Sequence, residues 1–136
     1  MAERETDLKI EVTNCLHYTE RNRKGEPTFR LELEFRIKNT GHYGTTLSKI
    51  EAVFHDSEKE YLMKSDLFQT EQEHPLTLTL PVENLWVQPH KTTDTGSVFL
   101  LKGTVIKQKV LKCSFILYHT HNEETFKVTS PFPPSS

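Results

Sequence analysis

Long hydrophobic runs are missing from this chain of 136 residues, and cysteine is scarce. No stretch of 18 or more apolar residues occurs, so the sequence predicts no membrane-spanning helix. The first nine residues are charged and lack the apolar segment of a secretory signal. With only two cysteines present, we expect an intracellular protein, cytoplasmic or nuclear, in which Cys15 and Cys113 are reduced thiols. A disulfide between them is the alternative that an oxidising compartment would allow.

An excess of charge of one sign is lacking too. The chain has 17 Lys and Arg residues against 19 Asp and Glu residues, which gives a net charge of −2 and a pI near 6.4. Proteins that bind nucleic acid through its phosphates need an excess of basic groups. We therefore expect no nucleic-acid partner. Apolar residues make up only 35% of the chain, which predicts a thin core with broad polar faces.

The common catalytic signatures are absent. The sequence contains neither Gly-x-x-x-x-Gly-Lys-Ser/Thr nor Gly-x-Gly-x-x-Gly, the loops that hold phosphates. It also lacks the hydrolase motif Gly-x-Ser-x-Gly and the zinc-protease motif His-Glu-x-x-His. Cys113 lies in an apolar segment, where a thiol usually serves as packing. We expect a protein that is not an enzyme and that binds no cofactor.

Residues that could ligate a metal are few. The aspartates stand singly, so no cage of oxygen ligands for calcium is evident. Residues two apart on a strand share a face, so Cys15 with His17 and His119 with His121 could supply four zinc ligands from neighbouring strands. The simpler interpretation places these histidines at the end of a strand, and we predict no metal site.

Alternation of apolar and polar residues with a period of two dominates the chain. It is clearest from Phe29 to Lys38, where every second residue is bulky and apolar and the others are charged. This pattern predicts a strand with one buried and one solvated face. The segment Leu8–Tyr18 alternates less cleanly. Its pattern predicts that Cys15 is on the polar face and that the buried face holds Leu8, Ile10, Val12, Leu16 and Tyr18.

Further strands are expected throughout the chain. No helix of ten or more residues is expected. Pro81 predicts an edge strand at Leu76–Val82, because proline cannot donate to a ladder of hydrogen bonds. The polar stretch Gln88–Gly96 predicts a loop. The other expected strands are Leu47–Phe54, Tyr61–Phe68 (which could also form a helical turn), Val98–Lys107, Val110–Thr120 and Thr125–Thr129.

Seven to eight short strands without crossover helices predict an all-β fold, an antiparallel immunoglobulin-like β-sandwich. A small β-barrel is the alternative, although five glycines are few for the corners of a barrel. We expect a single domain over residues 1–129 and a Pro-rich tail or linker over residues 130–136.

The run from Phe29 to Gly41 resembles the passage from strand to loop found in immunoglobulin-like sandwiches. It is similar to those of the intracellular accessory or appendage type. This resemblance implies a domain that binds other proteins. The Cys…Trp…Cys arrangement of antibody-type domains is not matched, because Trp86 is not in a central strand.

Two groups of residues are candidates for binding a partner. The first is Leu85, Trp86 and Val87, since tryptophan is enriched at the centres of protein interfaces. The alternative is that Trp86 closes one end of the core. The second group is basic and consists of Lys107, Lys109 and Lys112, whose alternative role is to protect a strand edge from aggregation.

We therefore predict a non-catalytic protein–protein interaction module that presents an edge strand or loops to another protein. A carrier of a lipid or small apolar ligand is the first alternative, and it would need an internal cavity of several hundred Å³. A small metal-dependent or cysteine enzyme is the second. The oligomeric state is left open.

Overall fold

The computed structural model describes residues 6–74, 76–120 and 122–133. This part of the chain forms ten strands, all paired antiparallel, and it contains no helix that could cross a membrane. The strands are β1 (Leu8–Arg21), β2 (Pro27–Asn39), β3 (Thr45–His55), β4 (Glu60–Ser65), β5 (Leu67–His74), β6 (Leu76–Glu83), β7 (Leu85–Val87), β8 (Thr92–Lys102), β9 (Leu111–His119) and β10 (Glu123–Ser130).

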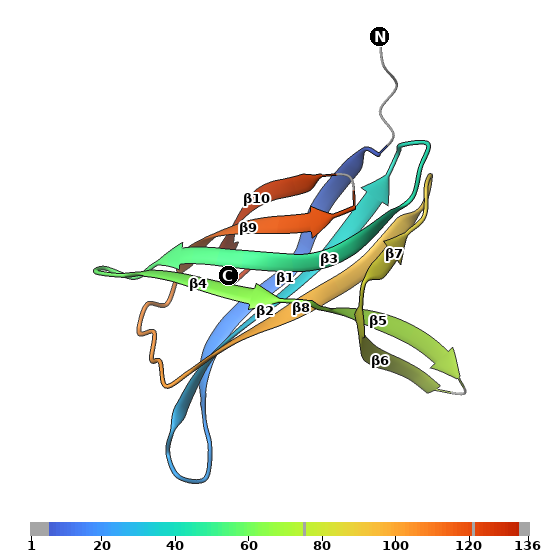
Figure 1. Cartoon of the computed structure of the whole chain (residues 1–136). Coiled ribbons are helices and arrows are strands. Elements are labelled where there is room, and N and C mark those ends of the chain that lie inside the picture. The colour runs from blue at the N-terminus through green and yellow to red at the C-terminus, as the bar shows by residue number, and fades with distance from the viewer. Residues whose placement is uncertain (1–5, 75, 121, 134–136) are drawn as a thin grey trace.

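Two sheets pack face to face with the core between them (Figure 1). One sheet has the strand order β1-β2-β8, and the other has the order β10-β9-β3-β4, with β7 beside β3. The predicted all-β antiparallel sandwich is confirmed, and the described strands do not close into a barrel. There are ten strands instead of seven or eight, because Asp66 divides one expected strand into β4 and β5, and because β7 was not expected.

Strand β2 lies at the centre of its sheet and carries the clearest alternation. Leu31, Leu33 and Phe35 are at most 1% exposed, whereas Glu34 and Arg36 face the solvent. Phe29 also belongs to the core, where its ring lies 5.4 Å from the ring of Phe54 on the opposite sheet. The face assignment made from the sequence is confirmed for this strand.

Strand β1 contains a β-bulge that the alternation did not predict. The pairing with β2 shifts between Val12 and Asn14, so that one extra residue enters the strand. An extra residue moves the following side chains to the opposite face. The prediction for the second half of this strand was therefore wrong: Cys15 is fully buried, and Leu16 and Tyr18 are about two-fifths exposed.

Strand β8 begins earlier than expected. Thr92–Gly96 was predicted as part of a polar loop, but its backbone pairs with β2 from Lys38 to Glu34. Main-chain hydrogen bonds form regardless of side-chain polarity, which is why the polar composition was misleading. At its other end β8 stops at Lys102, and residues 103–110 form a loop in place of the expected continuation to Lys107.

The carboxyl-terminal segment returns to strand β1. Strand β10 ends at Ser130, so the expected domain boundary after residue 129 falls inside a strand. Phe132 pairs with Cys15 through two main-chain hydrogen bonds, and residues 131–132 thus lie against β1 instead of leaving the domain. Residues 134–136 of the expected tail lie outside the described residues.

Strands β5 and β6 form a hairpin that projects from the sandwich (Figure 1). At its base, Thr95 and Ser97 of β8 donate side-chain hydrogen bonds to the carbonyl oxygens of Gln69 and Leu67 at 2.8 and 3.0 Å. The flanking strands β4 and β7 both pair with β3: β7 pairs with its first residues, 45–47, and β4 pairs with residues 50–55. Within the described residues β6 pairs with β5 alone, which confirms the edge strand expected from Pro81.

Candidate partner-binding surface

The loop between β2 and β3 is fixed by a buried asparagine. Asn39 is fully buried at the end of β2, and its side chain accepts a hydrogen bond from Gly41 N–H and donates one to the carbonyl of Tyr43, both at 3.0 Å. The Asn39 backbone also donates to the carbonyl of Lys91 at 3.0 Å. The loop therefore has one well-determined shape, and it presents Tyr43 to the solvent.

Trp86 lies against this loop on strand β7. Strand β7 pairs with the start of β3, and Trp86 stands opposite Thr46. A Cβ at Gly44 would lie 2.3 Å from ring atom Cζ2 of Trp86, so the indole covers the backbone of Gly44 directly. Only glycine leaves room for this contact. The indole is held on one side and remains 54% exposed on the other.

Four ring-bearing residues share this end of the molecule, and we call them the aromatic surface: His42, Tyr43, Trp86 and His90. Tyr43 is 58% exposed. The rings of His42 and His90 meet edge to face with 5.8 Å between their centroids, which ties the β2–β3 loop to the turn before β8. His90 has a φ of 58°, in the left-handed region that turns use.

The three residues predicted as one binding segment point in different directions. Val87 is fully buried and belongs to the core, and Leu85 is partly buried against it. Only Trp86 of this trio presents most of its side chain to the solvent. Tyr43 was not among the residues predicted from the sequence to bind a partner. The available signal was an aromatic residue in a polar, glycine-containing turn.

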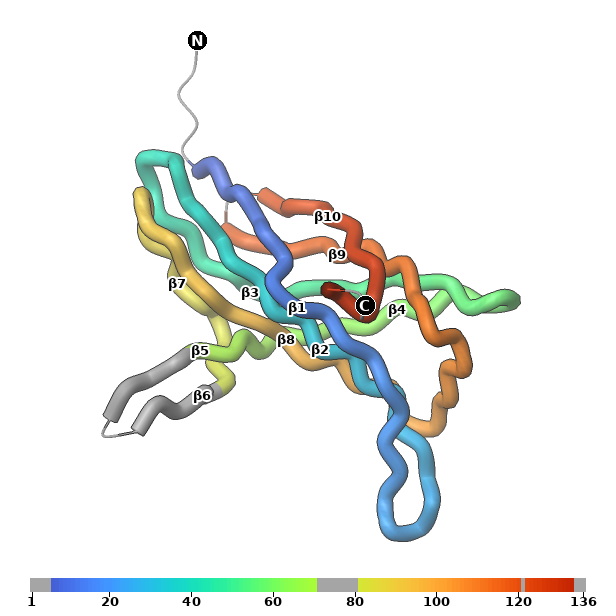
Figure 2. The backbone as a smooth tube through the Cα atoms, turned by 180° about the vertical axis from the view of Figure 1, so that it is seen from behind, coloured from blue at the N-terminus to red at the C-terminus, as the bar shows by residue number. Residues whose placement is uncertain are grey.

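The 103–110 loop, which contains part of the predicted basic group, lies at the opposite end of the sandwich from β7 (Figure 2). Lys107 and Lys109 are in the 103–110 loop and Lys112 is in β9, and all three side chains are exposed. The loop is attached to β1 because His17 Nε2 lies 3.1 Å from the carbonyl oxygen of Gln108. One compact partner-binding site therefore does not include both predicted groups.

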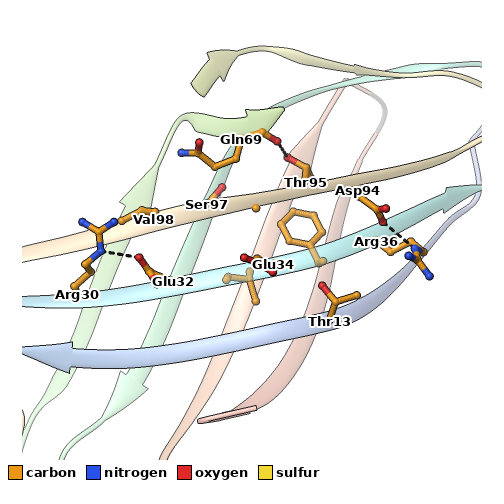
Figure 3. A pocket seen from close by; sticks show the side chains of 13 residues that line it. Thr13, Arg30, Glu32, Glu34, Arg36, Gln69, Asp94, Thr95, Ser97 and Val98 are labelled. Atoms are coloured by element: carbon orange, nitrogen blue, oxygen red, sulfur yellow. Dashed lines mark hydrogen bonds and ion pairs between the residues drawn. The ribbon is translucent and has the colours of Figure 1, made fainter. Parts of the chain in front are cut away.

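A hollow of about 500 Å³ lies on the outer face of the three-stranded sheet (Figure 3). At one end Arg30 Nε donates to Glu32 at 2.9 Å, and at the other Arg36 Nε donates to Asp94 at 2.8 Å. Glu34 lies between the two ion pairs. This hollow is polar and open, so it can accept a charged or hydrogen-bonding group and is unsuited to an apolar ligand.

The residues considered for zinc binding do not form a cluster in the part of the chain that the structure describes. Cys15 is in the core, and His17 bonds to Ser130 and to the carbonyl of Gln108. His119 is buried at the end of β9 beside Thr45, 2.8 Å from its hydroxyl oxygen. His121 lies outside the described residues.

Glu51 and Tyr118 form a polar cluster on the outer face of the second sheet. Tyr118 donates a hydrogen bond to the Glu51 carboxylate, and Lys64 Nζ lies 3.7 Å from the same group. The hydrogen bond lowers the pKa of Glu51, and the nearby lysines act in the same direction. The same hydrogen bond raises the pKa of Tyr118 to about 12. Both shifts arise from a surface interaction and not from a pocket, so they do not indicate a catalytic group.

Comparison with known proteins shows the fold alone. No protein-family model and no curated protein sequence matches the chain. The structure is similar to the crystal structure of a Bordetella pertussis protein assigned as ApaA, with a TM-score of 0.52, 15% identity, and coverage of 94% of this chain and 91% of that one. It is also similar to the X-ray structure of structural-genomics target SoR45, with a TM-score of 0.46, 12% identity, and coverage of 97% and 87%.

Proposed function

We propose that this domain is a non-catalytic protein–protein interaction module that binds its partner through the aromatic surface. The observation that carries the proposal is the exposure of Trp86 and Tyr43, at 54% and 58%, on backbone that the fold holds in place. Large aromatic side chains contribute most of the binding energy at many interfaces. A surface that is already ordered also loses less conformational entropy when it binds.

The ordering of this surface can be traced to individual contacts. The Asn39 side chain donates a hydrogen bond to the main-chain carbonyl of Tyr43, and the indole of Trp86 packs against the backbone of Gly44. The backbone at Tyr43 and the ring of Trp86 are therefore held in place before a partner arrives. We infer that the partner is a protein, because a tryptophan and a tyrosine fixed beside polar loop residues suit the apolar centre and polar rim of a protein interface.

The core between the sheets favours this proposal over an apolar-ligand carrier. Aromatic rings from the two sheets meet across the interior, with Phe99 and Phe115 at 5.9 Å and Phe29 and Phe54 at 5.4 Å between centroids. Contacts of this kind fill the space that a carrier would keep for its ligand. The proposal also places the domain inside the cell, supported by two cysteines that are free and buried.

The test is capture of partners from cell lysate, followed by affinity measurement with the captured protein. Trp86→Ala should weaken binding by about 2 kcal/mol or more, as expected for an aromatic anchor. The domain should stay folded, because the indole is half exposed. Leu62→Ala is the matched control, since Leu62 is 53% exposed on strand β4. A partner that binds the wild type and Trp86→Ala with equal affinity would contradict the proposal.

A further inference from the structure

Strand β1 has an outer edge on which the stretch before Cys15 is unpaired. On one side β1 pairs with β2 from end to end. On its other side, within the described residues, the only pairing is the bridge to Phe132, where Cys15 and Phe132 exchange hydrogen bonds of 2.8 and 2.7 Å. The stretch Leu8–Val12 therefore presents a free strand edge, and such an edge is a template for another strand.

The direction of the main-chain groups on this edge follows from the pairing with β2. Cys15 directs its N–H and C=O away from β2, toward Phe132, and it stands opposite Leu33. Main-chain groups alternate in direction along a strand, so Leu33, Phe35 and Ile37 of β2 share one direction. The residues of β1 that stand opposite Phe35 and Ile37 therefore direct their N–H and C=O groups the same way as Cys15 does. These are Val12 and Ile10. Their N–H and C=O groups thus face outward and are ready to pair.

Space for an added strand lies beside this edge. A groove of about 630 Å³ runs between β1 and β10, and its walls are largely apolar. It is lined by Ile10 and Val12 of β1, by Phe126 and Val128 of β10, and by Phe132. A strand that pairs with β1 could place alternate apolar side chains against these walls.

We propose that the occupant is strand β1 of a second copy of this chain, paired antiparallel about a twofold axis at Ile10. In this register Ile10 stands opposite its own counterpart and the two exchange both hydrogen bonds. Leu8 then stands opposite Val12 of the second copy. Such an interface is isologous, since each copy contributes the same residues.

Charge complementarity supports this register over those centred on either neighbouring residue. It places Lys9 of each copy opposite Glu11 of the other, at positions where side chains approach most closely because the backbones do not bond there. Within one chain Lys9 stands opposite Lys38, a like charge, so Glu11 of the second copy would offset that repulsion. Registers centred on Lys9 or on Glu11 would instead place like charges opposite each other.

Charge reversal tests the proposed register directly. The wild-type protein should sediment as a dimer. Lys9→Glu and Glu11→Lys should each be monomeric, because each places two like-charged pairs across the axis. A mixture of the two variants should recover a dimer that contains one chain of each kind, detectable by native mass spectrometry. Lys24→Glu, at the exposed turn between β1 and β2, is the matched control and should remain dimeric.

A second variant tests the main-chain pairing. Ile10→Pro removes an N–H that points away from β2, so the monomer should keep its circular dichroism spectrum while the dimer is lost. A wild-type protein that is monomeric at millimolar concentration overturns the proposal and leaves the edge to a strand from another protein. A dimer that persists in Lys9→Glu, Glu11→Lys and Ile10→Pro also overturns it.

Discussion

Trp86 and Gly44 are in such close contact that any side chain at position 44 would collide with the indole. A Cβ there would stand 2.3 and 2.4 Å from two ring atoms and 2.9 Å from the carbonyl oxygen of Val87. The ring is the part that can move, since it is half exposed and at the end of a side chain. The orientation of the aromatic surface thus depends on the absence of one methyl group.

Gly44→Ala should displace the indole and destabilise the domain by about 1–3 kcal/mol, the usual cost of an extra methyl group in a packed contact. Trp86 is the only tryptophan in the chain, so fluorescence reports on it alone. The emission maximum should shift to the red as the ring moves into water. An unchanged emission spectrum would show that the contact does not hold the ring.

Leu33→Asp and Glu34→Lys should differ strongly in their effect on stability. Leu33 is 1% exposed in the core, so an aspartate there is buried without a partner and should cost several kcal/mol. Glu34 faces the solvent on the same strand, and its substitution should change the stability by less than about 0.5 kcal/mol. Urea unfolding measures both, and equal effects would contradict the face assignment of β2.

Glu51→Gln should reduce stability more at pH 7 than at pH 3. The hydrogen bond from Tyr118 lowers the pKa of Glu51 in the folded state below its ordinary value of 4.5. The stabilisation is therefore present above pH 4.5 and is lost as the pH falls through the folded-state pKa. Chemical unfolding at the two pH values gives the difference. A penalty that is the same at both would mean that the carboxylate charge contributes nothing.

Neither cysteine should react with iodoacetamide at pH 8 while the protein is folded. Burial raises the pKa of Cys15 to about 11 and that of Cys113 to about 12, and only the thiolate is nucleophilic. Mass spectrometry should show an unmodified chain under native conditions and two added groups after unfolding in urea. Rapid modification of the folded protein at Cys15 would contradict its burial.

Strands with an unbroken alternation were predictable from the sequence. On β2 and β9, side chains two residues apart enter the core together: Leu33 and Phe35 on the first, Phe115 and Leu117 on the second. Burial on one face selects for this pattern, so the pattern reveals the face. The edge position of β6 was also accessible, because a missing N–H at Pro81 is a property of the residue itself.

The remaining features depend on contacts between distant segments. The bulge after Val12 changes the face of Cys15, yet no residue near it marks an extra position in the strand. Thr92 extends β8 because Lys38 supplies a backbone partner. The exposure of Trp86 follows from its contact with Gly44, which is 42 residues away along the chain and beside it only after β3 and β7 pair. Local composition contains none of this information.

Strands β4 and β7 both pair with β3, and the β5–β6 hairpin lies between them in the chain. The hairpin is therefore placed like an insertion into the second sheet. Strand β3 would keep both neighbours if the outer part of the hairpin were shortened, because its pairing begins again at Leu47 opposite Leu85. Lengthening or trimming the hairpin by matched pairs of residues changes how far it reaches and leaves the register of the sandwich untouched. This position is therefore the natural point at which the domain can acquire a new binding arm, by evolution or by engineering, without a change to its core.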